Sequence, residues 1–147
     1  MVITDIISID RTECAVDCQS KKRIFEVISA IAVKHHPELD QGLVLSALVS
    51  REKMGSTGIG NGIALPHGRI NGIDDVMAIV VTSTTPINFD AIDNKPVDIF
   101  FAILVPSEQT EGHLQTLATI AQKLSDKAIV KTIRSAKTKD QIIEALA

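Results

Sequence analysis

The sequence contains no tryptophan and no tyrosine, and its four phenylalanines bring the aromatic content to only 3%. Proteins that bind single-stranded nucleic acid stack bases on aromatic side chains, so this class of function has little support. The net charge of −3 also argues against a surface for duplex DNA, which requires an excess of lysine and arginine. We therefore expect no nucleic-acid partner, and a core built from isoleucine, valine, leucine and alanine.

Cysteine is scarce as well. Cys14 and Cys18 are the only two, and their C-x-x-x-C spacing differs from the C-x-x-C pair of redox proteins. Two thiols without clustered histidines cannot complete a structural zinc site. This pattern predicts reduced thiols in a cytosolic protein, and we expect neither a metal nor another cofactor.

Long apolar runs are missing too. No stretch approaches the roughly 18 residues that cross a membrane, and the N-terminus lacks the basic and apolar regions of a signal peptide. We therefore expect a cytoplasmic protein without membrane insertion. The 147 residues, 45% of them hydrophobic, suit one domain over residues 1–147 with a packed core.

Apolar residues at helical spacing predict two helices in the first third of the chain. The first begins after the cap Ser20 and ends before Pro37. The second begins after the cap Asp40 and ends near Gly55. Its expected inward-facing residues are Leu43, Ala47 and Leu48.

Continuous apolar runs at 77–81 and 97–105 predict strands that are buried on both faces. Turns are expected at Thr85–Pro86 and Asp93–Pro96. Three further helices are predicted after Pro106, with the candidate caps Thr110, Ser125 and Thr138. The fold class is therefore α/β or α+β, with one sheet flanked by helices on both faces.

Among the four histidines, His67 has the setting best suited to chemistry. Pro66 fixes the direction of the chain and Gly68 leaves space beside the ring, so the side chain is rigidly aimed and uncovered, as a nucleophile requires. A purely structural turn histidine is the alternative. His35 and His36 lie at a predicted helix end, where the helix dipole favours surface histidines.

A glycine-rich loop at 55–62 precedes a short strand at 63–65 and a tight turn at 66–68. Its backbone amides can converge on an anion beside His67. The candidate phosphoryl-binding residues are Gly58, Ile59, Gly60, Asn61 and Gly62. The dinucleotide fingerprint fails because Ile63 occupies its last glycine position, and no P-loop Gly-Lys-Ser/Thr is present. A flexible loop without a ligand remains the alternative.

Two more side chains are candidates for the same site. His113 lies in the first turn of a predicted helix, where the dipole favours a neutral ring able to donate to His67 or to a phosphoryl oxygen. Arg51 carries a planar donor fork that matches phosphoryl oxygens. The alternatives are a histidine at the edge of the core and a solvated charge at a helix end.

The segment 51–69, R-E-K-M-G-S-T-G-I-G-N-G-I-A-L-P-H-G-R, strongly resembles the fructose/mannitol-type enzyme IIA family of the phosphotransferase system. It is most similar to the nitrogen-regulatory branch. Segments 90–94, 96–98 and 104–106, together with His113-Leu114, match as well, so the resemblance covers nearly the whole chain. The family often has isoleucine where Leu65 stands, which is a conservative change.

This resemblance implies a mixed sheet and a phosphorylated His67, with Nε2 as the attachment atom and with His113 and Arg51 in the same active site. It implies a phosphohistidine donor of the HPr or NPr kind, charged ultimately from phosphoenolpyruvate. Neutral His67 would attack the donor's phosphorus while Arg51, His113 and the loop amides stabilise the transferring charge.

Three functions stay open. In the first, which the loop sequence favours, phosphorylation regulates partner proteins; by resemblance, these are potassium-transport or sensor-kinase proteins. In the second, a sugar-specific IIA passes phosphate to a IIB cysteine. In the third, the chain is a non-covalent small-anion or nucleotide-binding module that needs the glycine loop but not His67.

Overall fold

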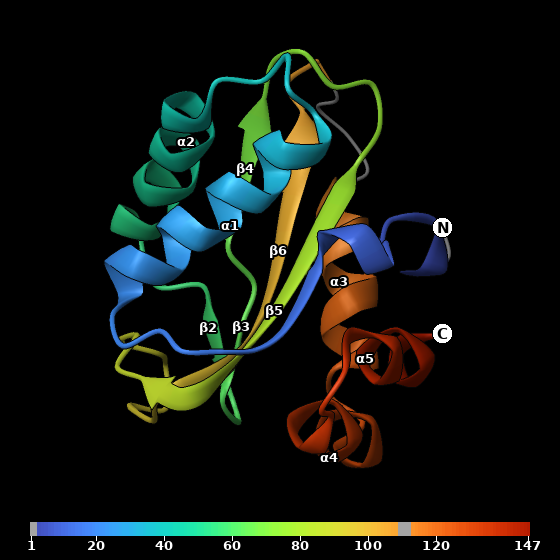
Figure 1. Cartoon of the computed structure of the whole chain (residues 1–147). Helices are drawn as coiled ribbons and strands as arrows, with labels where there is room; N and C mark the ends of the chain where they lie inside the picture. Colours follow the sequence, from blue (N-terminus) through green and yellow to red (C-terminus); the bar gives the residue numbers. More distant parts are fainter. Residues whose placement is uncertain (1–2, 109–112) are drawn as a thin grey trace.

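The computed structural model describes residues 3–108 and 113–147, except for the side chains of residues 113 and 114. Two short 3-10 helices open the described chain, and helices enclose the strands on both sides (Figure 1). The elements in chain order are η1 (Ile3–Asp5), η2 (Ile9–Arg11), β1 (Thr12–Val16), α1 (Lys21–His35), α2 (Gln41–Lys53), β2 (Gly58–Gly60), β3 (Ile63–Ala64), β4 (His67–Ile70), β5 (Met77–Ile87), β6 (Val97–Pro106), α3 (His113–Lys123), α4 (Lys127–Ser135) and α5 (Lys139–Leu146).

Polar caps start the helices largely as the sequence predicts. The Ser20 hydroxyl accepts from the amide of Arg23, and the Asp40 carboxylate caps α2. Thr138 forms a capping box at the start of α5. The predicted cap Ser125 is wrong by one residue: the Asp126 carboxylate accepts the first amides of α4. The predicted cap Thr110 lies outside the described residues.

The strands form one mixed sheet in the order β1-β5-β6-β3-β2. β5 and β6 are antiparallel neighbours at its centre, and β1 runs parallel to β5. β3 and β4 both pair with β6 in parallel, one after the other along the same edge. This end-to-end arrangement places His67, the first residue of β4, opposite Ile103 of β6.

The two central strands are buried on both faces, which confirms the sequence prediction. Alternate residues of β6 belong to two separate cores: Phe100 and Leu104 face one, while Phe101 and Ile103 face the other. Helices α1 and α2 cover the first face, and α3, α4 and α5 cover the second (Figure 1). The predicted fold class is thus confirmed.

Some local predictions differ from the structure, including the tight turn expected at 66–68, where β4 begins at His67. Leu43 is 69% exposed and the fully buried Val44 takes its place on the inner side of α2, whereas Leu48 is buried and Ala47 packs against the core as predicted. The expected turn at Thr85–Pro86 is instead part of β5, where a shift in pairing register before Ile87 accommodates the proline. Strand β1 was not predicted, because it is short and only its first residue is buried.

Within the described residues, no helix combines the length and the apolar character needed to cross a membrane.

Candidate functional site

His67 is held at the start of β4 by a hydrogen bond within its own segment. Its Nδ1 lies 2.9 Å from the carbonyl oxygen of Leu65, and the residue is half-buried. A carbonyl oxygen can only accept, so Nδ1 must carry the proton. The neutral ring therefore keeps its lone pair on Nε2.

Arg51 meets the other side of the same ring from the last turn of α2. Its Nε donates to His67 Nε2 over 3.2 Å, and its Nη1 donates to the carbonyl oxygen of Gly55 over 2.9 Å. A guanidinium only donates, so Nε2 must be the acceptor, which agrees with the tautomer set by Leu65. The structure thus brings together two of the residues that the sequence singled out.

Helix α2 can approach β4 this closely because residue 68 is glycine. A Cβ on Gly68 would lie 3.2 Å from the Cβ of Ala47 and 3.3 Å from its backbone carbon and oxygen. Ala47 lies one helical turn before Arg51, so the spacing at Gly68 sets the distance from the guanidinium to the ring. Gly68 thereby contributes to the site through packing.

Glu52, the residue after Arg51, forms a partly buried ion pair with Lys21 that was not predicted from the sequence. Glu52 is 8% exposed, and its Oε2 lies 2.7 Å from the Nζ of Lys21. Its Oε1 accepts from the Thr57 hydroxyl over 2.6 Å, and both oxygens accept from the Thr57 amide over 3.2 Å. A buried carboxylate is stable only when it is paired and hydrogen-bonded in this way.

These bonds continue from Glu52 to the ring of His67. The carbonyl oxygen of Thr57 accepts from the amide of Leu65 over 3.0 Å, and the carbonyl oxygen of Leu65 accepts from His67 Nδ1. Glu52 thus fixes the segment that orients His67. A signal for it was present in the sequence, because Glu52 lies four residues beyond Leu48 on the buried stripe of α2.

The glycine-rich segment is a β-hairpin where the sequence predicted a loop. β2 and β3 pair through Gly58 with Ala64 and Gly60 with Ile63, and Ile59 is exposed. The turn is Asn61–Gly62, and both residues have positive φ, 58° and 79°, as a two-residue hairpin turn requires. Glycine is needed at position 62 also because a Cβ there would overlap the Arg134 guanidinium.

The tip of this hairpin does not lie beside His67. Ile63 pairs with Ile99 and His67 with Ile103, so about 13 Å of β6 separates His67 from Ile63, the first residue after the tip. The amide of Asn61 already donates to a carboxylate oxygen of Asp93 over 3.1 Å. The phosphoryl-binding role of residues 58–62 stays a prediction, and the hairpin end nearer His67 is Gly58.

The other histidines lie elsewhere or are not described. The side chain of His113 lies outside the described part, so its predicted role in the site stays a prediction. His36 is on the surface, with Nδ1 3.0 Å from a carboxylate oxygen of Glu38. The Glu38 backbone amide and the His36 ring both lower the pKa of the Glu38 carboxyl.

Among the side chains that the structure describes, those of residues 3–108 and 115–147, we find no group of three or more histidine, cysteine, aspartate or glutamate residues that could hold a metal.

The chain resembles known proteins over almost its whole length. Residues 5–147 match the family described as phosphoenolpyruvate-dependent sugar phosphotransferase system, EIIA 2. A protein named "Nitrogen regulatory protein" from Klebsiella oxytoca is 46% identical over 147 residues, which cover 98% of this chain and 89% of that protein. Its namesake from Escherichia coli (strain K12) is 45% identical, with 98% and 88% covered.

A solved structure shows the same fold. The crystal structure of nitrogen regulatory protein IIA-Ntr from Neisseria meningitidis superposes with a TM-score of 0.91 at 33% sequence identity, covering 99% of each chain.

Proposed function

The chain belongs to the EIIA 2 family of the phosphoenolpyruvate-dependent sugar phosphotransferase system, and we propose that it accepts a phosphoryl group on Nε2 of His67 and regulates partner proteins through its phosphorylation state. The donor is a phosphohistidine carrier protein of the HPr or NPr kind.

The observation that carries this proposal is the fixed tautomer of His67. The Leu65 carbonyl holds the proton on Nδ1, and Nε2 presents its lone pair to the guanidinium of Arg51. A neutral imidazole nitrogen beside a planar cation is the arrangement that accepting a phosphoryl group requires. Nε2 of His67 is therefore the nucleophile.

The transfer step is a displacement at phosphorus. The Nε2 lone pair of His67 forms the new N–P bond while the N–P bond of the donor histidine breaks, and that electron pair returns to the donor ring. The His67 ring gains positive charge during this step, and its Nδ1–H already points at the Leu65 carbonyl oxygen, which stabilises that charge. This step uses neither a metal nor a nucleotide.

Arg51 changes partners during the transfer. Its Nε–H occupies the Nε2 lone pair and must leave it before phosphorus arrives. The Nη1 bond to the Gly55 carbonyl can hold the guanidinium in place meanwhile. The freed donors then face the phosphoryl oxygens, which carry the transferring charge. His113 is a further donor to these oxygens, and the sequence motif supports this role.

The regulatory role is supported by the relatives, since proteins 46% and 45% identical carry the name "Nitrogen regulatory protein". A phosphoryl group adds between about 1.5 and 2 negative charges to a surface that partners must contact. This added charge changes which partner surfaces are complementary to the site. The phosphorylated and unphosphorylated forms therefore bind different proteins. The predicted targets are potassium-transport or sensor-kinase proteins.

The proposal is tested by incubating the protein with phosphoenolpyruvate, enzyme I and carrier protein, and then measuring its mass. We expect the mass to increase by one phosphoryl group, and the increase to be lost in His67→Ala. His36→Ala, a surface histidine, is the matched control and should be phosphorylated normally. An unchanged mass increase in His67→Ala would refute the assignment.

A second incubation, with candidate IIB proteins and sugars, separates regulation from sugar transport. We expect the phosphoryl group to remain on the protein or to return to the carrier. Rapid transfer to a IIB cysteine and on to a sugar would instead establish the sugar-specific function.

A further inference from the structure

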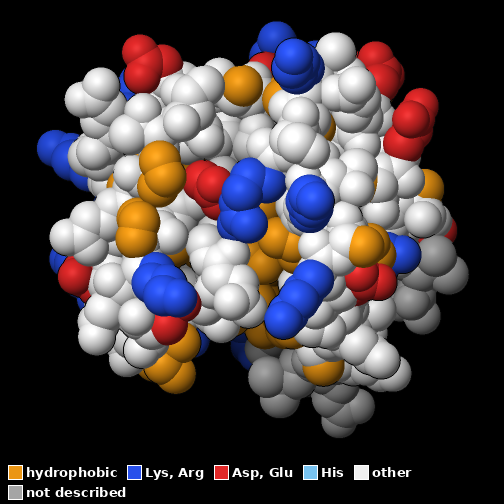
Figure 2. Space-filling model, turned by 90° about the horizontal axis from the view of Figure 1, so that it is seen from below, with side chains coloured by type: hydrophobic (Ala, Val, Ile, Leu, Met, Phe, Trp, Pro, Cys, Tyr) orange, Lys and Arg blue, Asp and Glu red, His pale blue; other side chains and the backbone are white. Residues whose placement is uncertain are grey.

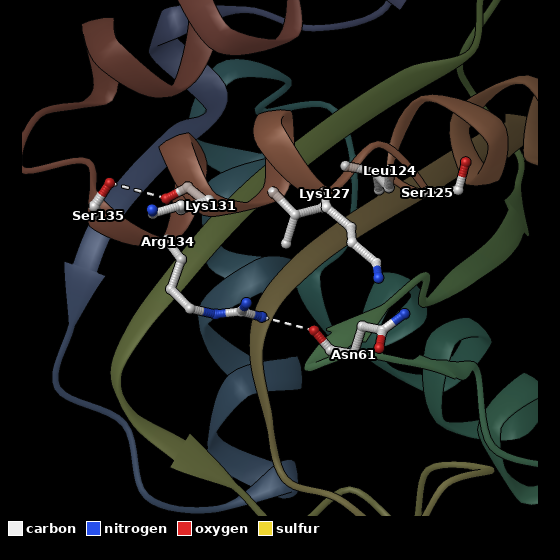
Figure 3. Close-up of a pocket in the computed structure, with 8 residues that line it drawn as sticks. Asn61, Leu124, Ser125, Lys127, Lys131, Arg134 and Ser135 are labelled. Atoms are coloured by element: carbon white, nitrogen blue, oxygen red, sulfur yellow. Dashed lines mark hydrogen bonds between the residues drawn. The ribbon is translucent and has the colours of Figure 1, made fainter.

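A cavity of about 460 Å³ lies between the hairpin tip and helix α4, away from His67. Its volume is within the range of small-molecule sites, about 300–1,000 Å³. Figure 3 shows the side chains that line it. The lining residues are Asn61, Leu124, Ser125, Lys127, Val130, Lys131, Arg134 and Ser135.

Two lysines give this cavity its charge. Lys127 and Lys131 are one turn apart on α4 and exposed, so their stems lie on the same side of the helix. In the part of the chain that the structure describes, neither lysine forms an ion pair. Two unpaired ammonium groups at one cavity are notable in a protein with a net charge of −3. They favour a ligand that carries two negative charges.

Arg134 holds the wall of the cavity in place, and its positive charge is already paired with Asp98. Its Nε donates to Asp98 Oδ2 over 2.8 Å, and its Nη2 donates to the Asn61 carbonyl over 2.7 Å. Asp93 holds the Asn61 amide from the other direction. The hairpin tip is therefore fixed before any ligand arrives, which lowers the entropic cost of binding.

The remaining lining is partly polar and partly apolar. In Figure 3, the Lys127 ammonium and the Asn61 side-chain amide point toward one another across the cavity. Leu124 and Val130 contribute buried apolar surface, with 2% and 6% exposure. Seen from below, blue side chains surround an orange hollow (Figure 2). Such a lining suits a ligand with an apolar body and an anionic end.

We propose that this cavity, called here the α4 cavity, binds a small organic dianion, either a phosphate monoester or a dicarboxylate. Its charged group lies between the Lys127 ammonium and the side-chain amide of Asn61, from which it accepts, and Lys131 adds its charge from the next turn of α4. Its body lies against Leu124 and Val130. The site is separate from the phosphoryl acceptor, since about 13 Å of β6 lies between Ile63, the first residue after the hairpin tip, and His67.

The test is a titration of the ¹⁵N-labelled full chain, followed by NMR, with four small-molecule probes and, separately, a tetraglutamate peptide. Phenyl phosphate and phthalate carry the dianion on an apolar body, inorganic phosphate lacks the body, and benzyl alcohol lacks the charge. We expect phenyl phosphate or phthalate to saturate at about millimolar concentration, with shifts at Asn61 and along α4. The stronger of the two identifies the anionic group. Inorganic phosphate should bind several-fold more weakly, and benzyl alcohol should not saturate.

The double variant Lys127→Ala/Lys131→Ala should weaken binding about tenfold or more, because both charged donors are removed. Lys139→Ala is the matched control, since Lys139 is an exposed first residue of α5 as Lys127 is of α4. It should bind like the parent protein.

Three outcomes would overturn the proposal: equal binding by the double variant, shifts confined to the surroundings of His67, or equal affinity for inorganic phosphate. A tetraglutamate peptide that saturates where both aromatic dianions fail would also overturn it, and would indicate a surface for an acidic protein. Phosphorylation of His67 is measured separately, so either proposal can fail while the other stands.

Discussion

Replacing Glu52 by glutamine should loosen the orientation of His67 without touching the ring. The carboxylate pairs with Lys21 and accepts from the hydroxyl and amide of Thr57. Thr57 in turn holds Leu65, whose carbonyl fixes the proton on His67 Nδ1. Glu52→Gln preserves the size of the side chain but removes its charge, so the change tests the network and not the packing.

The size of the effect follows from these contacts. Hydrogen bonds to a charged group contribute about 1.5–3 kcal/mol each, and glutamine retains one oxygen for Thr57. Removing one partner of a fully buried ion pair costs about 3–5 kcal/mol. Here the cost is smaller, because the Lys21 side chain is 27% exposed and also donates to the Phe89 carbonyl. We expect the free energy of unfolding to fall by about 2 kcal/mol.

Two assays separate stability from orientation. Urea denaturation gives the free energy of unfolding, and long-range ¹H–¹⁵N spectra of the His67 ring give the share of the Nδ1–H tautomer. The free energy of unfolding and the share of the Nδ1–H tautomer should both fall in Glu52→Gln. Phosphorylation should be about tenfold slower, because a misplaced nucleophile attacks poorly. Thr57→Val, which removes only the hydroxyl, should shift the tautomer in the same direction with a smaller loss of stability.

The control is Glu144→Gln, which changes an exposed glutamate on α5 and should leave the stability, the tautomer and the rate unchanged. If Glu52→Gln lost stability but kept both the tautomer and the phosphorylation rate, the inference that Glu52 positions His67 would be refuted.

Three further substitutions test Arg51, Gly68 and the residue that holds the hairpin tip, Asp93. Arg51→Lys should fold normally but accept phosphate about 10²–10³-fold more slowly in a mass-spectrometric time course, because lysine lacks the planar fork; an unchanged rate would contradict the role given to the guanidinium. Gly68→Ala should displace α2 and lower the unfolding free energy by about 1 kcal/mol, measured in urea; full stability would show that the close approach is unimportant. The amides of Lys95 and Asn61 hold the pKa of the Asp93 carboxyl below its usual value of 3.8, so Asp93 contributes stability above that pH and loses it as the pH falls through the lower folded value. Asp93→Asn should therefore be less stable than the parent at neutral pH, and thermal unfolding should show the two converging in strong acid; a constant difference would contradict this linkage.

The sequence predicted the helices well, because their boundaries are encoded locally. Ser20, Asp40 and Thr138 each accept amides of the helix that follows, as their positions indicated. The central strands were equally visible, since an unbroken apolar run can only be buried on both faces. The short strand β1 could not be predicted in this way, because its place beside β5 depends on pairing with residues nearly 70 positions away.

The site was predicted in part, because only some of its residues can be recognised from their local sequence. His67 and Arg51 were identified from their local settings and from the family motif, and the structure places them in contact. Glu52 was missed, because its role depends on contacts with Lys21 and Thr57 that only the fold brings together. The glycine segment was misjudged, since the pairing that makes it a hairpin depends on β6 as well as on its own residues.

In the mechanism that we propose, Nε2 of His67 takes the phosphoryl group because the Leu65 carbonyl holds the proton on Nδ1. The most direct measurement is ³¹P–¹⁵N correlation NMR on the ¹⁵N-histidine-labelled protein after phosphorylation by the carrier. Phosphorus coupled to Nε2 of His67, with the Nδ1 proton still present, is the result that we predict. Phosphorus on Nδ1, or on any other histidine, would contradict the account.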